Sequence, residues 1–180
     1  MNLYPIKLQF FLSYGALGSI GPLMALILKE AKDFSPRQIA LTLSLSSLGM
    51  LFTPAFMTYL ADKSVDTRKI LRWSFTLTAS ALIFLYYLNN TVQITLAWTL
   101  YSIAFVPVLP LLDGYFFNYK RSVENNGGSC VEYNKIRIWG SIGFIAPSCV
   151  LFYVLSGDKT IANSLWCAVL SLIHISEPTR

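Results

Sequence analysis

The chain has 180 residues, of which 54% are hydrophobic and 13% are charged, and its formal net charge is +5. A soluble domain carries roughly 45–50% apolar and about 25% charged residues. The composition therefore excludes an ordinary soluble domain and indicates an integral membrane protein. The basic residues lie in short loops between apolar blocks rather than along one polar face, so no nucleic-acid partner is expected.

Apolar blocks of about 20 residues, the length that a helix needs to cross a bilayer, recur along the chain. They predict an all-α membrane protein with five complete spans and the start of a sixth, in one bundle over residues 1–169. The Ser35-Pro36 step predicts a helix start with proline at the first helical position. The spans are expected at about 5–28, 39–60, 70–88, 92–117, 136–155 and 161–169.

Basic residues are distributed unevenly between the two sides of the predicted bundle. Because cytoplasmic loops are enriched in lysine and arginine, the N-terminus is predicted to be cytoplasmic. The loops between spans two and three and between spans four and five carry Lys63, Arg68, Lys69, Arg72, Lys120, Arg121 and Lys135. The opposite loops carry Lys29, Lys32, Arg37 and Lys159.

The last residues, Leu170 to Arg180, resemble the translated read-through of a sequencing-library adapter. We therefore predict that 170–180 is a non-native tail and set it aside from the fold. Two expectations follow from this interpretation. The single histidine, His174, would not be native, and the natural protein would continue beyond about residue 169.

One carboxylate and one guanidinium interrupt the apolar blocks on either side of the longest loop. Asp113 lies shortly before this loop and Arg137 a similar distance after it, so the two are expected at similar depth. A charge at mid-membrane costs about 2.5–3.5 kcal/mol on insertion scales, so it normally faces a partner or a cavity. We predict that the two groups pair and bind a solute. Alternatively, Arg137 extends to the headgroups while Asp113 caps a helix or neutralises Lys120.

The segment ADKSVDTRK, Ala61 to Lys69, places acidic and basic residues in the turn between spans two and three. Such residues could form reversible ion pairs with a neighbouring helix end, as a gate requires. Surface ion pairs are each worth only about 0–1 kcal/mol. On spacing alone, a solvated loop that sets the topology is the favoured interpretation.

Glycines recur every third position in SYGALGSIGP (13–22), and WGSIGF in span five carries Gly140 and Gly143. Small residues let helices approach closely, whereas a Gly-Pro step can bend a helix beside a cavity. Both interpretations are open.

Four segments of the chain resemble a known family. PLLDGY (110–115) followed by YNKIRIWGSIGF (133–144) resembles the span-four and span-five signature of the lactose-permease and phenylpropionate-permease branch of the major facilitator superfamily. ADKSVDTRK resembles that superfamily's loop motif, and LGSIGP loosely matches its span-one glycine and proline positions. Carried over, the resemblance implies the substrate-site residues Asp113, Arg137, Gly18 and Pro22 and the gating residues Asp62, Lys63, Arg68 and Lys69.

The resemblance also implies a fold and a function. The fold would be the N-terminal six-helix bundle, with a C-terminal six-helix half outside this chain. The function would be secondary active transport of a small polar or aromatic solute by alternating access, in symport with a proton and without a cofactor. The location would be the bacterial inner membrane, where the bundle contacts the lipid bilayer.

Two other function classes compete with transport, an enzyme and a receptor or scaffold. An intramembrane hydrolase would need paired acids or a histidine-based site, and with His174 set aside the apolar blocks offer neither. Cys130, Cys149 and Cys167 lack metal-site spacing and are expected to be isolated thiols. We therefore expect no enzyme. A non-transporting receptor or scaffold on the same fold is the remaining alternative, because fold does not dictate function.

Overall fold

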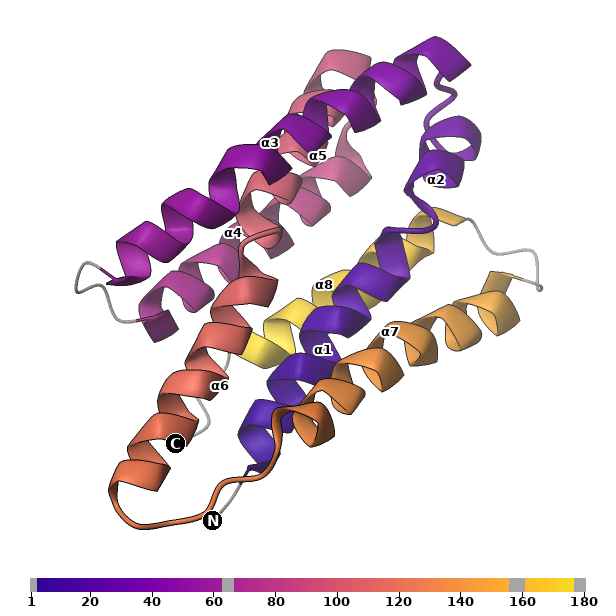
Figure 1. Ribbon diagram of the computed structural model, residues 1–180. Coiled ribbons are helices and arrows are strands. Elements are labelled where there is room, and N and C mark those ends of the chain that lie inside the picture. Colours follow the sequence, from indigo (N-terminus) through magenta and orange to yellow (C-terminus); the bar gives the residue numbers. More distant parts are fainter. Residues whose placement is uncertain (1–2, 63–66, 156–160, 177–180) are drawn as a thin grey trace.

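The computed structural model is built of helices and describes residues 3–62, 67–155 and 161–176 (Figure 1). Among these described residues, three segments are long and apolar enough to cross a membrane: Tyr4–Glu30, Thr67–Tyr87 and Thr91–Asn125. The expected all-α membrane architecture is confirmed. The helices are α1 (Tyr4–Ile20), α2 (Met24–Glu30), α3 (Pro36–Asp62), α4 (Thr67–Tyr87), α5 (Thr91–Phe105), α6 (Val108–Asn125), α7 (Tyr133–Leu155) and α8 (Ser164–Ser176), with a 3-10 turn at Ile161–Asn163.

Two helix starts show how the sequence sets the element boundaries. α3 begins at Pro36, as predicted, behind a reciprocal cap. The Ser35 N–H donates to Gln38 Oε1 over 2.8 Å, and the Gln38 N–H donates to Ser35 Oγ over 3.4 Å. At the start of α5, Asn90 Oδ1 accepts from the N–H groups of Val92 and Gln93.

Two apolar segments that were predicted as single spans each consist of two helices. α1 and α2 are separated at residues 21–23, and α5 and α6 at residues 106–107. Because Pro22 has no N–H, the Gly18 carbonyl loses its helical donor. The Ser148 hydroxyl of α7 donates to that carbonyl over 3.3 Å instead. The break in the first span is thus stabilised from a neighbouring helix.

The helices fall into two halves with the same order of elements. α1/α2, α3 and α4 make the first, and α5/α6, α7 and α8 the second, so each half begins with a broken segment. α1 packs mainly on α7 and α8, as α5 packs on α3 and α4, while α4 and α8 pack on each other. Figure 1 shows the α3–α5 and α1–α7 pairs on opposite flanks. This pattern is the one that an inverted three-helix repeat produces.

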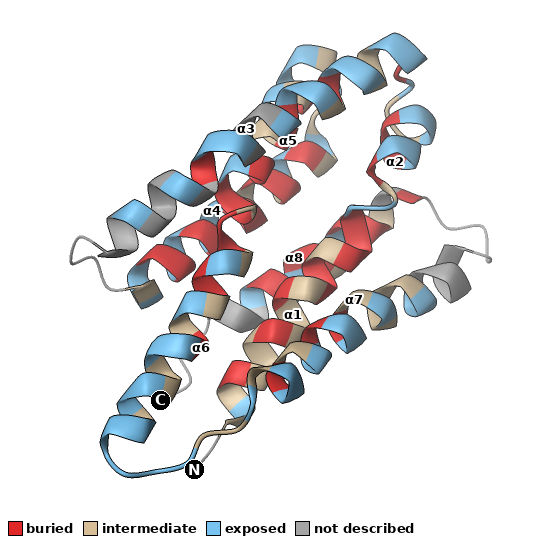
Figure 2. Cartoon of the chain, viewed as in Figure 1, coloured by how far each residue is buried: buried red, intermediate tan, exposed pale blue. Residues whose placement is uncertain are grey.

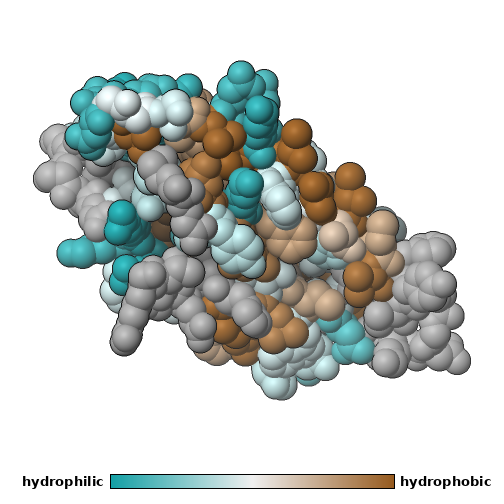
Figure 3. Space-filling model, turned by 90° about the horizontal axis from the view of Figure 1, so that it is seen from below, coloured by the Kyte–Doolittle hydropathy of each residue, from teal (hydrophilic) through white to brown (hydrophobic). Residues whose placement is uncertain are grey.

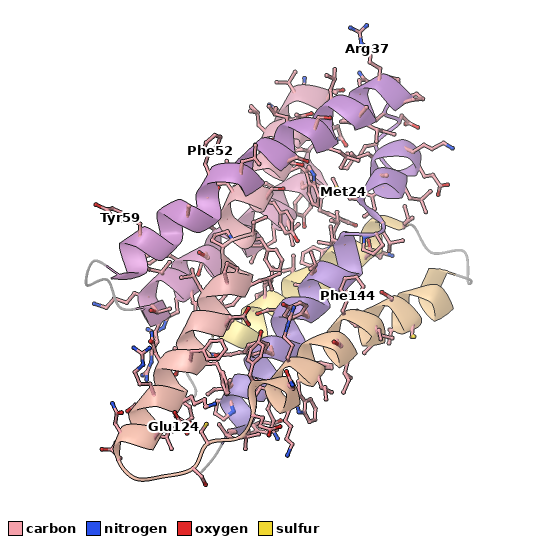
Figure 4. The ribbon with its side chains drawn as sticks, viewed as in Figure 1. Met24, Arg37, Phe52, Tyr59, Glu124 and Phe144 are labelled. Atoms are coloured by element: carbon pink, nitrogen blue, oxygen red, sulfur yellow. The ribbon has the colours of Figure 1, made fainter. Side chains whose placement is uncertain are left out.

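Buried side chains gather on the inner faces of the helices, and exposed ones cover the outside (Figure 2). Many of the exposed side chains are large and apolar; Phe52 and Trp73 are 75% and 76% exposed, and Phe52 points away from the bundle (Figure 4). Figure 3 shows hydrophobic surface beside hydrophilic patches on the face seen from below. An apolar exterior is the surface that a lipid-embedded bundle requires.

Lys32, in the loop after α2, ties the end of the first span to the end of α4. Its ammonium donates to the carbonyls of Tyr86 over 2.9 Å and Leu88 over 2.6 Å. Carbonyls in the last turn of a helix lack helical donors, and a cation there also complements the helix dipole. Burial lowers the pKa of the Lys32 ammonium below its ordinary value, so the two hydrogen bonds offset a desolvation cost.

Replacing Lys32 by methionine is expected to lower the free energy of unfolding by about 1 kcal/mol, because two terminal carbonyls lose a charged donor. Thermal unfolding of the detergent-solubilised protein, followed by circular dichroism, measures this loss. The matched control is Lys29→Met, since Lys29 is an exposed lysine in the last turn of α2. Equal losses in both variants would contradict a specific contribution from the Lys32 contacts.

Candidate functional site

Asp113 is held by a tyrosine from the next helix. The carboxylate lies half-buried in α6, and its Oδ1 accepts from the Tyr133 hydroxyl over 2.7 Å. Tyr133 is the first residue of α7, and the loop between the two helices reverses the chain at Gly127, whose φ of 75° favours glycine. This reversal brings the two residues together although they are 20 positions apart.

Arg137 lies one turn further along α7. Its guanidinium carbon is 4.4 Å from the centroid of the Tyr14 ring of α1, which is a cation–π contact. Gly140 makes room for that ring, because a Cβ at position 140 would lie 2.7 Å from Tyr14 Cδ2. Since residues four apart share one helix face, Tyr133 and Arg137 point to the same side of α7. The Asp113 carboxylate, held by Tyr133, and the Arg137 guanidinium thus belong to one wall made by α1, α6 and α7, with Tyr133 and Arg137 about one helical turn apart along α7.

The expected ion pair between Asp113 and Arg137 is not formed. The ion pair within the described residues joins Lys120 to Glu124, with 3.7 Å between Nζ and Oε1. The physical reason is that each site group has a nearer partner, the Tyr133 hydroxyl for the carboxylate and the Tyr14 ring for the guanidinium. The alternative in which Asp113 neutralises Lys120 is also not observed, because Lys120 pairs within its own helix.

The unused hydrogen-bond donors and acceptors of this wall define which solutes it can bind. A carboxylate offers about four acceptor positions and a guanidinium five donors. Within the described residues, one acceptor position of Asp113 is used and the guanidinium edge makes no hydrogen bond. The arrangement suits a solute that carries both hydroxyl donors and carbonyl acceptors.

Gly18 and Pro22 lie elsewhere. Gly18 is buried where α1 meets α7, and a Cβ there would collide with the Phe144 carbonyl, two turns of α7 beyond Arg137 (Figure 4). Close packing is therefore what the structure shows at this glycine. Pro22 is exposed, in the break between α1 and α2. Neither residue is brought to the Asp113 carboxylate, and their assignment to the substrate site stays a prediction.

The loop motif lies only partly within the described residues. Asp62 ends α3, Lys63 falls outside the described residues, and Arg68 and Lys69 are exposed in the first turn of α4. The Arg68 guanidinium lies 5.7 Å from the centroid of the Tyr115 ring in α6. The motif therefore contacts the helix that carries Asp113, although its gating role stays untested.

Sequence reasoning missed two members of the site, Tyr14 and Tyr133. A signal for Tyr133 was present, since its spacing of four from Arg137 places both on one face of α7. Tyr14 had no such signal, because only the packing of α1 on α7 brings it to the guanidinium. Across the described residues, no three His, Cys, Asp or Glu side chains gather into a metal site.

Comparison with known proteins finds relatives of this chain. Nucleoside permease NupG of Escherichia coli (strain K12) is 27% identical over 175 residues, which cover 95% of this chain and 40% of that relative, and NupG of Shigella flexneri gives the same values. A crystal structure of the nucleoside transporter NupG matches with a TM-score of 0.86 at 25% identity, covering 98% of this chain and 43% of that one. A mutant form of NupG matches with a TM-score of 0.85.

The chain thus spans less than half the length of these relatives. They are permeases and not enzymes, which agrees with the expectation that this chain is not a hydrolase. A family model described as the MFS_1 like family matches residues 3–175 and so extends, like α8, into the segment predicted to be a foreign tail; that origin stays a prediction. The chain belongs to the MFS_1 like family, within the major facilitator superfamily of transporters.

Proposed function

We propose that this chain is part of a secondary transporter for nucleosides, in which Asp113 and Arg137 bind the solute from the N-terminal side of an alternating-access site. The observation that carries the proposal is the wall of α1, α6 and α7, on which the half-buried Asp113 and Arg137 keep free acceptors and donors. A nucleoside matches both, because its ribose hydroxyls can donate to Asp113 while a carbonyl or a ring nitrogen of its base accepts from Arg137. Both curated relatives are named nucleoside permeases.

The finer features are part of the same proposal. The lactose-permease and phenylpropionate-permease resemblance favours a sugar or an aromatic acid, but the named relatives favour a nucleoside, which shares hydroxyl groups with sugars. We include symport with a proton, a cytoplasmic N-terminus and a bacterial inner-membrane location. We also include gating by Asp62, Lys63, Arg68 and Lys69, which the Arg68–Tyr115 contact supports by linking that motif to α6.

Uptake of tritiated uridine into proteoliposomes tests the proposal with a full-length protein that contains this chain. We expect accumulation that depends on an inward proton gradient, is abolished by a protonophore, and is competed by adenosine but not by lactose or 3-phenylpropionate. Uptake no greater than in empty vesicles would favour a receptor or scaffold. Competition by lactose alone would replace the solute class, and uptake insensitive to the protonophore would overturn only the proton coupling.

A further inference from the structure

The Tyr133 side chain is fixed on three sides at the junction of α6 and α7. Its ring lies 5.1 Å from the Phe117 ring at an interplanar angle of 28°, and 5.7 Å from the Phe116 ring at 45°. Phe116 is fully buried, so it offers a rigid surface. The hydroxyl then completes the contact with Asp113 Oδ1. Tyr133 therefore has a fixed direction, which it imposes on the carboxylate.

This hydrogen bond leaves the other carboxylate oxygen free. Tyr133 donates to Oδ1, and within the described residues Oδ2 of Asp113 makes no hydrogen bond or ion pair. Arg137 lies over the Tyr14 ring and Lys120 pairs with Glu124, so neither cation pairs with Asp113. An anchored carboxylate with one free oxygen is an acceptor of defined direction.

If the hydrogen bond between Tyr133 and Asp113 served only to join α6 and α7, its acceptor would not need to be a charged carboxylate. Burying part of a carboxylate costs free energy that one hydroxyl only partly offsets, and a neutral or apolar partner would join the two helices at lower cost. The charge is explained if Oδ2 is reserved for a ligand.

We infer that Tyr133 is a positioning residue of the solute site: its hydroxyl orients Asp113 so that Oδ2 accepts a hydrogen bond from a solute hydroxyl, which makes the site selective for hydroxyl-bearing solutes such as ribosides. The inference rests on the proposed function. Tyr133 itself does not contact the solute, and it acts through Asp113.

Tyr133→Phe tests this role because it keeps the ring contacts and removes only the hydroxyl. In the full-length protein, the KM for uridine uptake is expected to rise about five- to tenfold, the factor that one hydrogen bond supplies, with a smaller change in kcat. The KM for 2′,3′-dideoxyuridine, which lacks the ribose diol, is expected to stay within about twofold, so the preference for uridine falls. A merely structural role would raise both KM values equally.

The matched control is Tyr119→Phe in α6, because the Tyr119 hydroxyl makes no hydrogen bond within the described residues. Tyr133→His, which supplies a ring N–H donor, is expected to keep part of the preference. An unchanged preference in Tyr133→Phe would overturn the inference, as would loss of membrane expression in both Tyr133 variants, which would show a structural role. Asp113→Asn separates the two proposals: normal uridine uptake in that variant would refute the site itself, whereas lost uptake beside a neutral Tyr133→Phe refutes only the role of Tyr133.

Discussion

Replacing Arg137 by alanine is expected to lower nucleoside uptake about 100-fold, and Asp113→Ala to do the same, while both variants still insert into the membrane. Removing the protein's side of a buried, charged hydrogen bond to a solute costs about 2–5 kcal/mol. Each 1.4 kcal/mol is a factor of about ten in affinity. Membrane insertion is expected to survive, because the Arg137 side chain contacts the Tyr14 ring and, within the described residues, donates no hydrogen bond to the backbone. Uridine uptake and membrane expression, measured on the same vesicles, separate the two effects.

Two further variants sharpen this test. Arg137→Lys keeps the positive charge but loses the planar donor fork, so an intermediate loss of uptake is expected. Arg121→Ala removes an exposed arginine near the end of α6 and is expected to leave uptake unchanged. Near-normal uptake in both Asp113→Ala and Arg137→Ala would rule out this wall as the solute site.

Replacing Gly143 by leucine is expected to destabilise the bundle by about 3 kcal/mol, near the upper end of the cost of overpacking. A Cβ at Gly143 would collide with the Phe11 carbonyl, just as one at Gly18 would collide with the Phe144 carbonyl. Both obstacles are backbone atoms, which cannot rotate away, so α1 and α7 would have to separate. The expected result is a lower unfolding temperature or loss of folded protein in detergent, measured by circular dichroism and size-exclusion chromatography.

Gly114→Leu is the matched control for this substitution. Gly114 also lies within a helix, but a Cβ there would meet no atom within 4 Å. Its unfolding temperature should therefore stay near that of the parent protein. If Gly114→Leu and Gly143→Leu unfolded at the same temperature, the close approach of α1 and α7 would not be the cause.

The sequence was informative about which groups are functional candidates and less so about how they pair. The order of residues around one loop predicts that Asp113 and Arg137 come near each other. It does not tell which group on α7 reaches the carboxylate, because Tyr133 and Arg137 occupy the same face one turn apart. The partner of Arg137 depends on Tyr14, 123 residues earlier, and so on the packing of α1 against α7.

The prolines likewise show what residue type predicts and what packing decides. Pro22 and Pro107 fall in helix breaks, whereas Pro110 lies in the first turn of α6 and Pro147 lies inside α7 without ending it. A proline in the first turn removes no helical hydrogen bond. One inside a membrane helix is tolerated when neighbours compensate for the lost bond. Residue type alone therefore identified the candidates for a break, and the neighbouring helices determined which of them became one.

The contact of α1 with α7 through Gly18 and Gly143 has a mechanical consequence. Where two backbones touch, no flexible side chain lies between them to absorb a displacement. If Arg137 binds the solute as proposed, a displacement of α7 at that residue would carry α1 with it as far as the helix break at Pro22.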